Sequence, residues 1–188
     1  LSDGLRAERE QGITINVAYR FFSSPTRSYV LADTPGHERY TRNTFTGASN
    51  AHVAVLLVDA RKGLLRQTRR HARIATLVGV PHIVAAVNKI DLVDFSAERF
   101  AELVADLNEL ATNVGAAEIT AIPVAAKLGD NVVNKSENTP WYTGPTLLEY
   151  LEGIELHAPN PVARELRLPI QWVSRPGPDG KRSYTGRV

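Results

Sequence analysis

Six consecutive residues, Asp33-Thr34-Pro35-Gly36-His37-Glu38, combine groups that could act on a phosphate. They follow the apolar run 29–32, which predicts a buried strand. A carboxylate at a strand end, such as that of Asp33, can hold a Mg²⁺ ion directly or through water. Gly36 lets its backbone N–H approach a phosphate without a side chain in the way, and His37 can position a water molecule. Together these residues have the parts of a site that senses a terminal phosphate.

Asp-x-x-Gly alone is a common turn sequence, so its meaning depends on companion motifs. Gly12-Ile13-Thr14 lies upstream of it. Asn88-Lys89-Ile90-Asp91 follows the apolar run 83–87, and Ala125-Ala126-Lys127 follows the apolar run 119–124. Each motif therefore stands beside a predicted strand.

Hydrophobic periodicity predicts the elements that carry these motifs. Apolar residues alternate with polar ones over 13–21, which predicts a strand with one buried face, paired antiparallel with a strand over 28–32. Continuous apolar runs over 53–58, 83–87 and 119–124 suit parallel strands that are covered on both faces. We expect helices over 39–51, over 67–78 closed by Gly79, from the N-cap Ser96 to 114, and from Pro145 in a first helical turn to 154.

Strands that alternate with helices of this length predict an α/β fold with a doubly wound, mostly parallel sheet. Ligands of such sheets bind beyond the carboxyl ends of the strands, so Asp33, Asn88 and Ala126 should converge on one edge. Two strands over 168–173 and 184–188 flank a turn rich in proline and glycine, which predicts the opening hairpin of a truncated β-barrel domain. The expected domains are 1–157 and 158–188.

The motifs, in this order, resemble those of GTPases of the translation-factor class, and the resemblance covers nearly the whole chain. It implies a P-loop-type GTPase domain that binds GTP and Mg²⁺. It implies that the Thr14 hydroxyl binds Mg²⁺, that Asp33 holds the ion through water, and that the Gly36 N–H bonds the γ-phosphate. His37 matches the position that orients the attacking water, and Thr34 and Pro35 complete this nucleotide-contacting segment.

The same resemblance assigns the two later motifs to the base. Asp91 can accept hydrogen bonds from both N1–H and N2–H₂ of guanine, whereas adenine presents no such pair of donors. Asn88 would brace the neighbouring loops, and the stem of Lys89 would lie over the ring. In Ala125-Ala126-Lys127 the Ala126 N–H would meet the guanine oxygen, although the family usually has serine where Ala125 stands.

No Gly-x-x-x-x-Gly-Lys-Ser/Thr segment occurs in the 188 residues. In the family this phosphate loop, with the strand before it, precedes the residues that correspond to Leu1. Because the sequence also contains no methionine, we expect an internal fragment that lacks the first strand and the phosphate loop. The alternative is a degenerate domain that binds without hydrolysing.

The stretch 131–148, with Asp91-Leu92-Val93-Asp94-Phe95, looks like that of the GTPase subunit (large subunit, subunit 1) of bacterial sulfate adenylyltransferase. The resemblance implies that GTP hydrolysis drives formation of adenylyl sulfate from ATP and sulfate on a catalytic partner subunit. Some relatives are fused to an adenylylsulfate kinase. An elongation factor that delivers tRNA is the alternative within the class.

Composition limits the possible partners and the cellular compartment. The net charge of +2 is too small to indicate nucleic acid or an acidic membrane as the partner. The chain has no cysteine, which excludes disulfides and thiolate sites and is compatible with the cytoplasm. A basic run is predicted to be either a solvated helix face or a contact surface for a partner subunit; it comprises Arg61, Lys62, Arg66, Arg69, Arg70 and Arg73.

Overall fold

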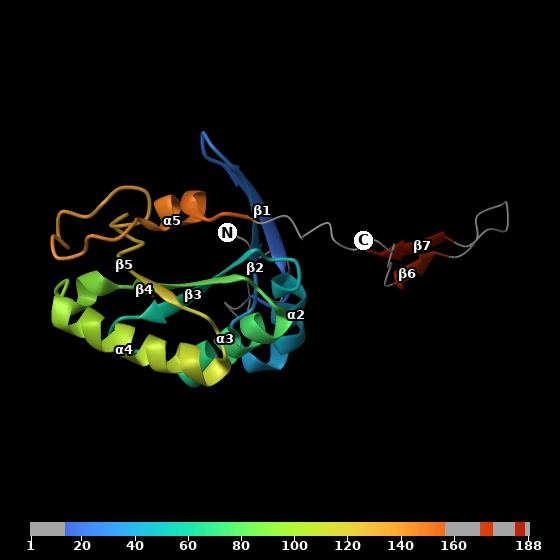
Figure 1. Cartoon of the computed structure of the whole chain (residues 1–188), viewed down its shortest axis with the longest axis horizontal. Coiled ribbons are helices and arrows are strands. Elements are labelled where there is room, and N and C mark those ends of the chain that lie inside the picture. The colour runs from blue at the N-terminus through green and yellow to red at the C-terminus, as the bar shows by residue number, and fades with distance from the viewer. Residues whose placement is uncertain (1–13, 157–169, 175–182, 187–188) are drawn as a thin grey trace. The chain divides into compact units, whose positions relative to one another are not determined.

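The structure, a computed structural model, describes residues 14–156, 170–174 and 183–186 (Figure 1). The chain divides into two units between Ile154 and Glu155, and each unit is described by itself. Among the described residues, no helix has both the length and the apolar character that a membrane span requires.

A parallel sheet in the order β3-β4-β5 forms the centre of the larger unit, as the continuous apolar runs predict. Its strands are β3 (Val53–Asp59), β4 (His82–Asn88) and β5 (Thr120–Val124). The interior of β4, residues 83–87, is buried throughout. Helices α3 (Arg66–Val78) and α4 (Ala97–Val114) cover one face of the sheet, and the segment with α5 (Leu147–Gly153) covers the other (Figure 1).

The ends of these helices follow from local chemistry. The Ser96 hydroxyl accepts a hydrogen bond from the Arg99 N–H at 3.1 Å, which satisfies one donor of the first turn of α4. Gly79 and Gly115 end α3 and α4 in the left-handed conformation, with φ of 85° and 74°. Both caps confirm the predictions. Pro145, however, precedes α5 instead of lying in its first turn, because Thr146 forms the N-terminal capping box with Glu149.

Strands β1 (Ala18–Ser23) and β2 (Ser28–Asp33) form the predicted antiparallel hairpin, but two details of the prediction are wrong. The strand begins at Ala18, since 14–17 are not in a strand. The alternating face is also not buried: Tyr19 is 54% and Phe21 78% exposed. The reason is that β1 and β2 form a sheet of their own, and period-two alternation shows which residues share a face but not what covers it.

The chain after β2 turns through a short 3₁₀ helix, η1 (Glu38–Tyr40), into α2 (Thr41–Ala48). The prediction of one helix over 39–51 is therefore right in type and too long. A second 3₁₀ helix, η2 (Ile90–Val93), follows β4. Each short helix begins inside a predicted motif, η1 at Glu38 and η2 at Ile90, so each motif spans the turn from a strand into a helix.

The smaller unit contains β6 (Ile170–Ser174) paired antiparallel with β7 (Ser183–Gly186), which confirms the predicted hairpin. An irregularity in the pairing falls between Ile170 and Trp172. The β-barrel and the domain boundary at 157/158 stay predictions.

Asn131 holds the long connection between β5 and α5. Its side chain is 1% exposed, its Nδ2 donates to Pro123 O and to Thr139 Oγ1, both at 2.9 Å, and its Oδ1 accepts from the Ser136 N–H at 2.8 Å. Its φ of 55° lies in the left-handed region, which asparagine tolerates better than most residues. One buried amide therefore organises residues 123–139.

We expect Asn131→Ala to lower the free energy of unfolding by about 2–4 kcal/mol, because it leaves buried polar groups without partners and puts alanine at a positive φ. Asn138→Ala is the matched control, since Asn138 is exposed in the same connection and should cost less than about 0.5 kcal/mol. Urea unfolding of both variants measures the difference. Equal midpoints for the two would show that Asn131 does not hold the connection.

Candidate functional site

The carboxyl ends of the three parallel strands lie in one row. Asp59 at the end of β3 pairs with Asn88 at the end of β4, and Asn88 pairs with Val124 at the end of β5. This register brings the predicted base motifs 88–91 and 125–127 to the same edge. Asp33 ends β2, which belongs to the separate hairpin sheet, so strand pairing does not join it to this row.

Asn88 is the centre of this edge. Its Oδ1 accepts hydrogen bonds from the N–H of Lys89 at 2.8 Å and from the N–H of Ala126 at 3.0 Å. A single carbonyl oxygen thus ties together the turn after β4 and the turn after β5. The bracing role predicted for Asn88 is present, and its partner is the same Ala126 N–H that was predicted to meet a base.

Lys89 is held by a group that the motif analysis missed. Its Nζ lies 2.9 Å from Oδ2 of Asp59, and the Arg61 guanidinium donates to both oxygens of the same carboxylate at 3.0 and 2.8 Å. The hydrogen bond from Arg61, followed by that from Lys89, holds the pKa of Asp59 well below its usual range. Asp59 is therefore an anion that fixes the direction of the lysine stem.

The turn from 89 to 95 has an unusual backbone. Lys89, Asp94 and Phe95 have φ of 64°, 53° and 50°, a region that costs non-glycine residues roughly 1–2 kcal/mol each. Two contacts hold the turn: Ile90 is completely buried, and the Trp141 indole donates to the Phe95 carbonyl at 2.9 Å. Strain of this kind collects at functional sites. Asp91 lies in this turn and is half-buried, and Arg61 attracts its charge.

The segment 33–37 is held by a hydrogen bond at Pro35 and has open space beside Gly36. Pro35 is buried, and its carbonyl accepts a hydrogen bond from the buried Thr44 hydroxyl at 2.9 Å. At Gly36 the position that a Cβ would take has no protein atom within 4 Å. The space beside the Gly36 α-carbon is therefore open among the described residues, and a contact of its N–H with phosphate stays a prediction.

His37 is exposed, and its Nδ1 accepts a hydrogen bond from the Arg39 N–H at 3.2 Å. An imidazole that accepts at Nδ1 carries its proton on Nε2 when it is neutral. His37 can therefore donate from Nε2 to a water molecule but cannot take a proton there in this tautomer. This geometry is compatible with the predicted role of His37 in orienting water, which stays a prediction.

Helix α2 forms hydrogen bonds with two segments that precede it, one at Ile15 and one at Pro35. Asn43 Nδ2 donates to the Ile15 carbonyl at 2.6 Å, next to Thr14, while the adjacent Thr44 holds Pro35. A Cβ at Gly47 would collide with the methyl group of Thr34, so this glycine allows the helix to lie against the segment. Thr14 is half-buried outside any strand, and Gly12 and Ile13 lie outside the described residues.

The sequence analysis missed the groups that hold the motifs, which are Asp59, Asn43, Thr44 and Asn131. Asp59 could have been found from the sequence, because it follows an apolar run in the same way as Asn88. Asn43 and Thr44 could not, since polar residues in a short helix usually face solvent. Among the predicted site residues, Ala125 is buried and donates its N–H to Asp130 O at 3.2 Å, while Lys127 is exposed.

The available groups fit a purine with two adjacent donors and a magnesium ion shared with phosphate. Asp91 supplies a carboxylate beside the Asn88 turn, and Ala126 supplies an N–H. No group of three His, Cys, Asp or Glu side chains that could form a metal cage occurs in the part of the chain that the structure describes. One carboxylate and one hydroxyl, from Asp33 and Thr14, nevertheless suit Mg²⁺, which takes its other ligands from water and phosphate in nucleotide sites.

Comparison with known proteins agrees with this chemistry. The family model of the elongation factor Tu GTP-binding domain matches residues 1–159. Bifunctional enzyme NodQ of Rhizobium meliloti (strain 1021) is 55% identical over 188 residues, and sulfate adenylyltransferase subunit 1 of Bacteroides fragilis (strain YCH46) is 53% identical over 188 residues. Each match covers 100% of this chain but only 29% and 39% of the two relatives.

Two solved structures are similar in fold. Bacterial selenocysteine-specific elongation factor EF-Sec aligns with a TM-score of 0.64 and 25% identity, covering 82% of this chain and 25% of that protein. Sup35 complexed with GDP aligns with a TM-score of 0.61 and 31% identity, covering 84% of this chain and 39% of that protein. Since the family model spans most of the sequence, the chain belongs to the elongation factor Tu GTP-binding domain family.

Proposed function

We propose that the chain is the GTP-binding part of a sulfate adenylyltransferase subunit 1, in which GTP hydrolysis drives a catalytic partner subunit to form adenylyl sulfate from ATP and sulfate. The observation that carries the proposal is the identity of 52–56% to proteins of that name, which extends over all of this chain and includes the distinctive stretch 131–148. Translation factors are also similar in fold, at 25–31% identity.

Recognition of guanine is assigned to the edge formed by β4 and β5. Asp91 would accept from both guanine donors, and the stem of Lys89, directed by Asp59, would lie along the ring. The Ala126 N–H already donates to Asn88 Oδ1 at 3.0 Å, so a guanine oxygen would share or replace that bond. Rejection of adenine would follow from leaving the Asp91 carboxylate unpaired in a half-buried position.

The γ-phosphate is assigned to the segment 33–37. The Gly36 N–H would donate to a phosphate oxygen, and Thr14 and Asp33 would help to hold Mg²⁺, whose charge neutralises the phosphates. His37 would orient the attacking water from Nε2, because its Nδ1 is engaged with Arg39. The anchoring of Pro35 by Thr44 would couple the presence of the γ-phosphate to the position of α2.

We expect His37→Ala in the full-length protein to slow GTP hydrolysis by roughly 10²–10³-fold while GTP affinity changes little. Loss of a group that acts only in the transition state appears in kcat. Single-turnover hydrolysis and equilibrium binding measure the two effects. His52→Ala is the matched control, because His52 is exposed and distant in sequence from every predicted motif. Equal hydrolysis rates for the His37 variant and the wild type would rule out this role.

The proposal as a whole is tested by reconstituting the full-length protein with an adenylyltransferase catalytic subunit. We expect adenylyl sulfate formation from ATP and sulfate to require GTP, and the yield to fall with GTP turnover in the His37→Ala variant. A fused or associated adenylylsulfate kinase would then transfer a phosphoryl group from ATP to the adenylyl sulfate product. Stable association with tRNA and none with the catalytic subunit would instead support a translation factor.

A further inference from the structure

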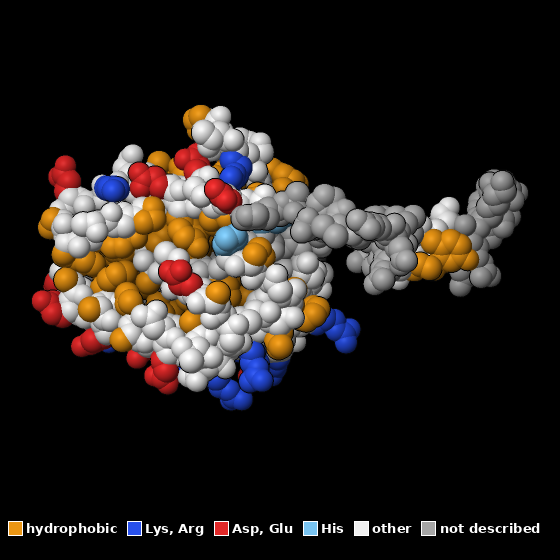
Figure 2. All heavy atoms as spheres, in the orientation of Figure 1, with side chains coloured by type: hydrophobic (Ala, Val, Ile, Leu, Met, Phe, Trp, Pro, Cys, Tyr) orange, Lys and Arg blue, Asp and Glu red, His pale blue; other side chains and the backbone are white. Residues whose placement is uncertain are grey.

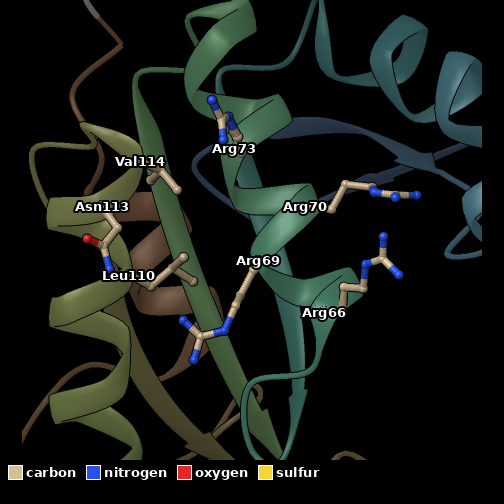
Figure 3. A pocket seen from close by; sticks show the side chains of 7 residues that line it. All are labelled: Arg66, Arg69, Arg70, Arg73, Leu110, Asn113 and Val114. Atoms are coloured by element: carbon tan, nitrogen blue, oxygen red, sulfur yellow. The ribbon is translucent and has the colours of Figure 1, made fainter.

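Four arginines lie along one side of helix α3, at positions 66, 69, 70 and 73. Spacings of three and four residues put them on the same helical face, and we call them the arginine stripe. Arg66, Arg69 and Arg73 are exposed, and Arg70 is half-buried. Figure 2 shows Lys and Arg side chains gathered toward the lower edge of the larger unit, in the region of α2 and α3, and Figure 3 shows the stripe itself.

The stripe does not stabilise its own helix. Its members repel one another at spacings of three and four residues, and Arg66 stands at the first helical position, next to the positive end of the helix dipole. Helix α3 has neither a side-chain cap nor an acidic residue in its first turn. Among the described residues, one ion pair reaches the stripe, from Glu38 to Arg70 at 3.6 Å. Carboxylates from another molecule would remove this repulsion.

A groove of about 360 Å³ runs beside the stripe, and its other wall is formed by Leu110 and Val114 of α4. Figure 3 shows Arg69 reaching toward α4, whereas Arg66 and Arg70 point to the other side of α3. One helical turn beyond Arg73, Leu77 is 74% exposed on the same face. Because the guanidinium groups diverge, they suit a row of separate carboxylates better than a single phosphate, and the apolar surface beside them suits an apolar side chain.

The surroundings favour protein over nucleic acid as the occupant. Among the described residues, no aromatic side chain lines the groove, so a base would find no aromatic ring to stack on there. Arginine beside exposed leucine is instead typical of protein interfaces.

We propose that the arginine stripe and its groove are the docking surface for an acidic segment of a protein partner. The inference rests on the proposed function, which identifies that partner as the catalytic subunit of the adenylyltransferase. Through Arg70 the surface touches Glu38, which directly follows His37. A partner carboxylate that pairs with Arg70 would release Glu38. Docking would therefore compete with Glu38 for Arg70, directly beside the segment 33–37.

The test compares two charge reversals in the full-length protein, R69E/R73E in the stripe and R20E/K135E at exposed sites outside the basic run. Both change the net charge equally. Binding to the purified catalytic subunit is measured by biolayer interferometry at several NaCl concentrations, with R69K/R73K as the charge-preserving variant. We expect R69E/R73E to weaken binding at least tenfold at physiological salt and to flatten its salt dependence, while R69K/R73K and R20E/K135E stay close to wild type.

Thermal melts and GTP affinity of each variant show whether the reversal has damaged the fold, and R69A/R73A replaces R69E/R73E if it has. Binding of the stripe variant within about twofold of R20E/K135E would overturn the docking surface while leaving the proposed function intact. Absence of binding by the wild type would overturn both. Loss of tRNA binding in place of subunit binding would assign the stripe to nucleic acid and also overturn the inference.

Discussion

Replacing Asp91 with asparagine in the full-length protein should lower GTP affinity by roughly 10²–10⁴-fold and raise affinity for XTP. The carboxylate of Asp91 is a pure acceptor, which matches the two donors N1–H and N2–H₂ of guanine. Xanthine keeps N1–H but has an oxygen in place of the amino group, so it matches an amide that both accepts and donates. The effect is large because the mismatched group would be half-buried and unpaired.

Competition binding with GTP, XTP and ATP measures this exchange of preference. Asp94→Asn is the matched control, because Asp94 lies in the same turn, is exposed, and has a positive φ that asparagine also tolerates. It should leave the order of preference unchanged. An Asp91→Asn protein that still prefers GTP over XTP would remove Asp91 from the base site.

Local sequence predicted the elements of this fold well where the deciding interactions are themselves local. The apolar run through β4 predicted a strand buried on both faces, and residues 83–87 are buried. Ser96, Gly79 and Gly115 predicted the helix ends because capping depends only on neighbouring backbone groups. The row Asp59, Asn88 and Val124 follows from parallel pairing, which brings strand ends to one edge.

Tertiary contacts account for what the sequence could not predict. Asn43 and Thr44 brace Ile15 and Pro35, but nothing in the short helix α2 distinguishes them from solvated polar residues. The apolar alternation of β1 predicted a covered face, yet whether a face is covered depends on elements far away in the sequence. The αL conformation of Lys89 likewise depends on the burial of Ile90 and on Trp141, which lies about fifty residues further along and reaches Phe95.

The polypeptide of residues 1–188, studied by itself, should neither bind GTP in the micromolar range nor hydrolyse it. Its sequence contains no Gly-x-x-x-x-Gly-Lys-Ser/Thr segment, the loop that cradles phosphates with backbone N–H groups and a lysine. Each such contact with a charged phosphate is worth about 1.5–3 kcal/mol, so the lack of three weakens binding by roughly 10³–10⁶-fold. The contacts with the base that are proposed for Asp91 and Ala126 would not compensate for this loss.

The same polypeptide should also fold poorly. No strand ladder joins β2 to β3. Leu57 on β3 is 71% exposed, and Val30, Leu31 and Val55 of the same two strands are exposed to a smaller extent. Unpaired strand edges next to exposed apolar surface promote association between chains. Calorimetric titration with GTP, thermal unfolding and light scattering test these expectations, with the full-length protein as the positive control. Micromolar GTP binding together with a cooperative melt of a monomer would contradict both the phosphate-loop argument and the argument from the unpaired strands.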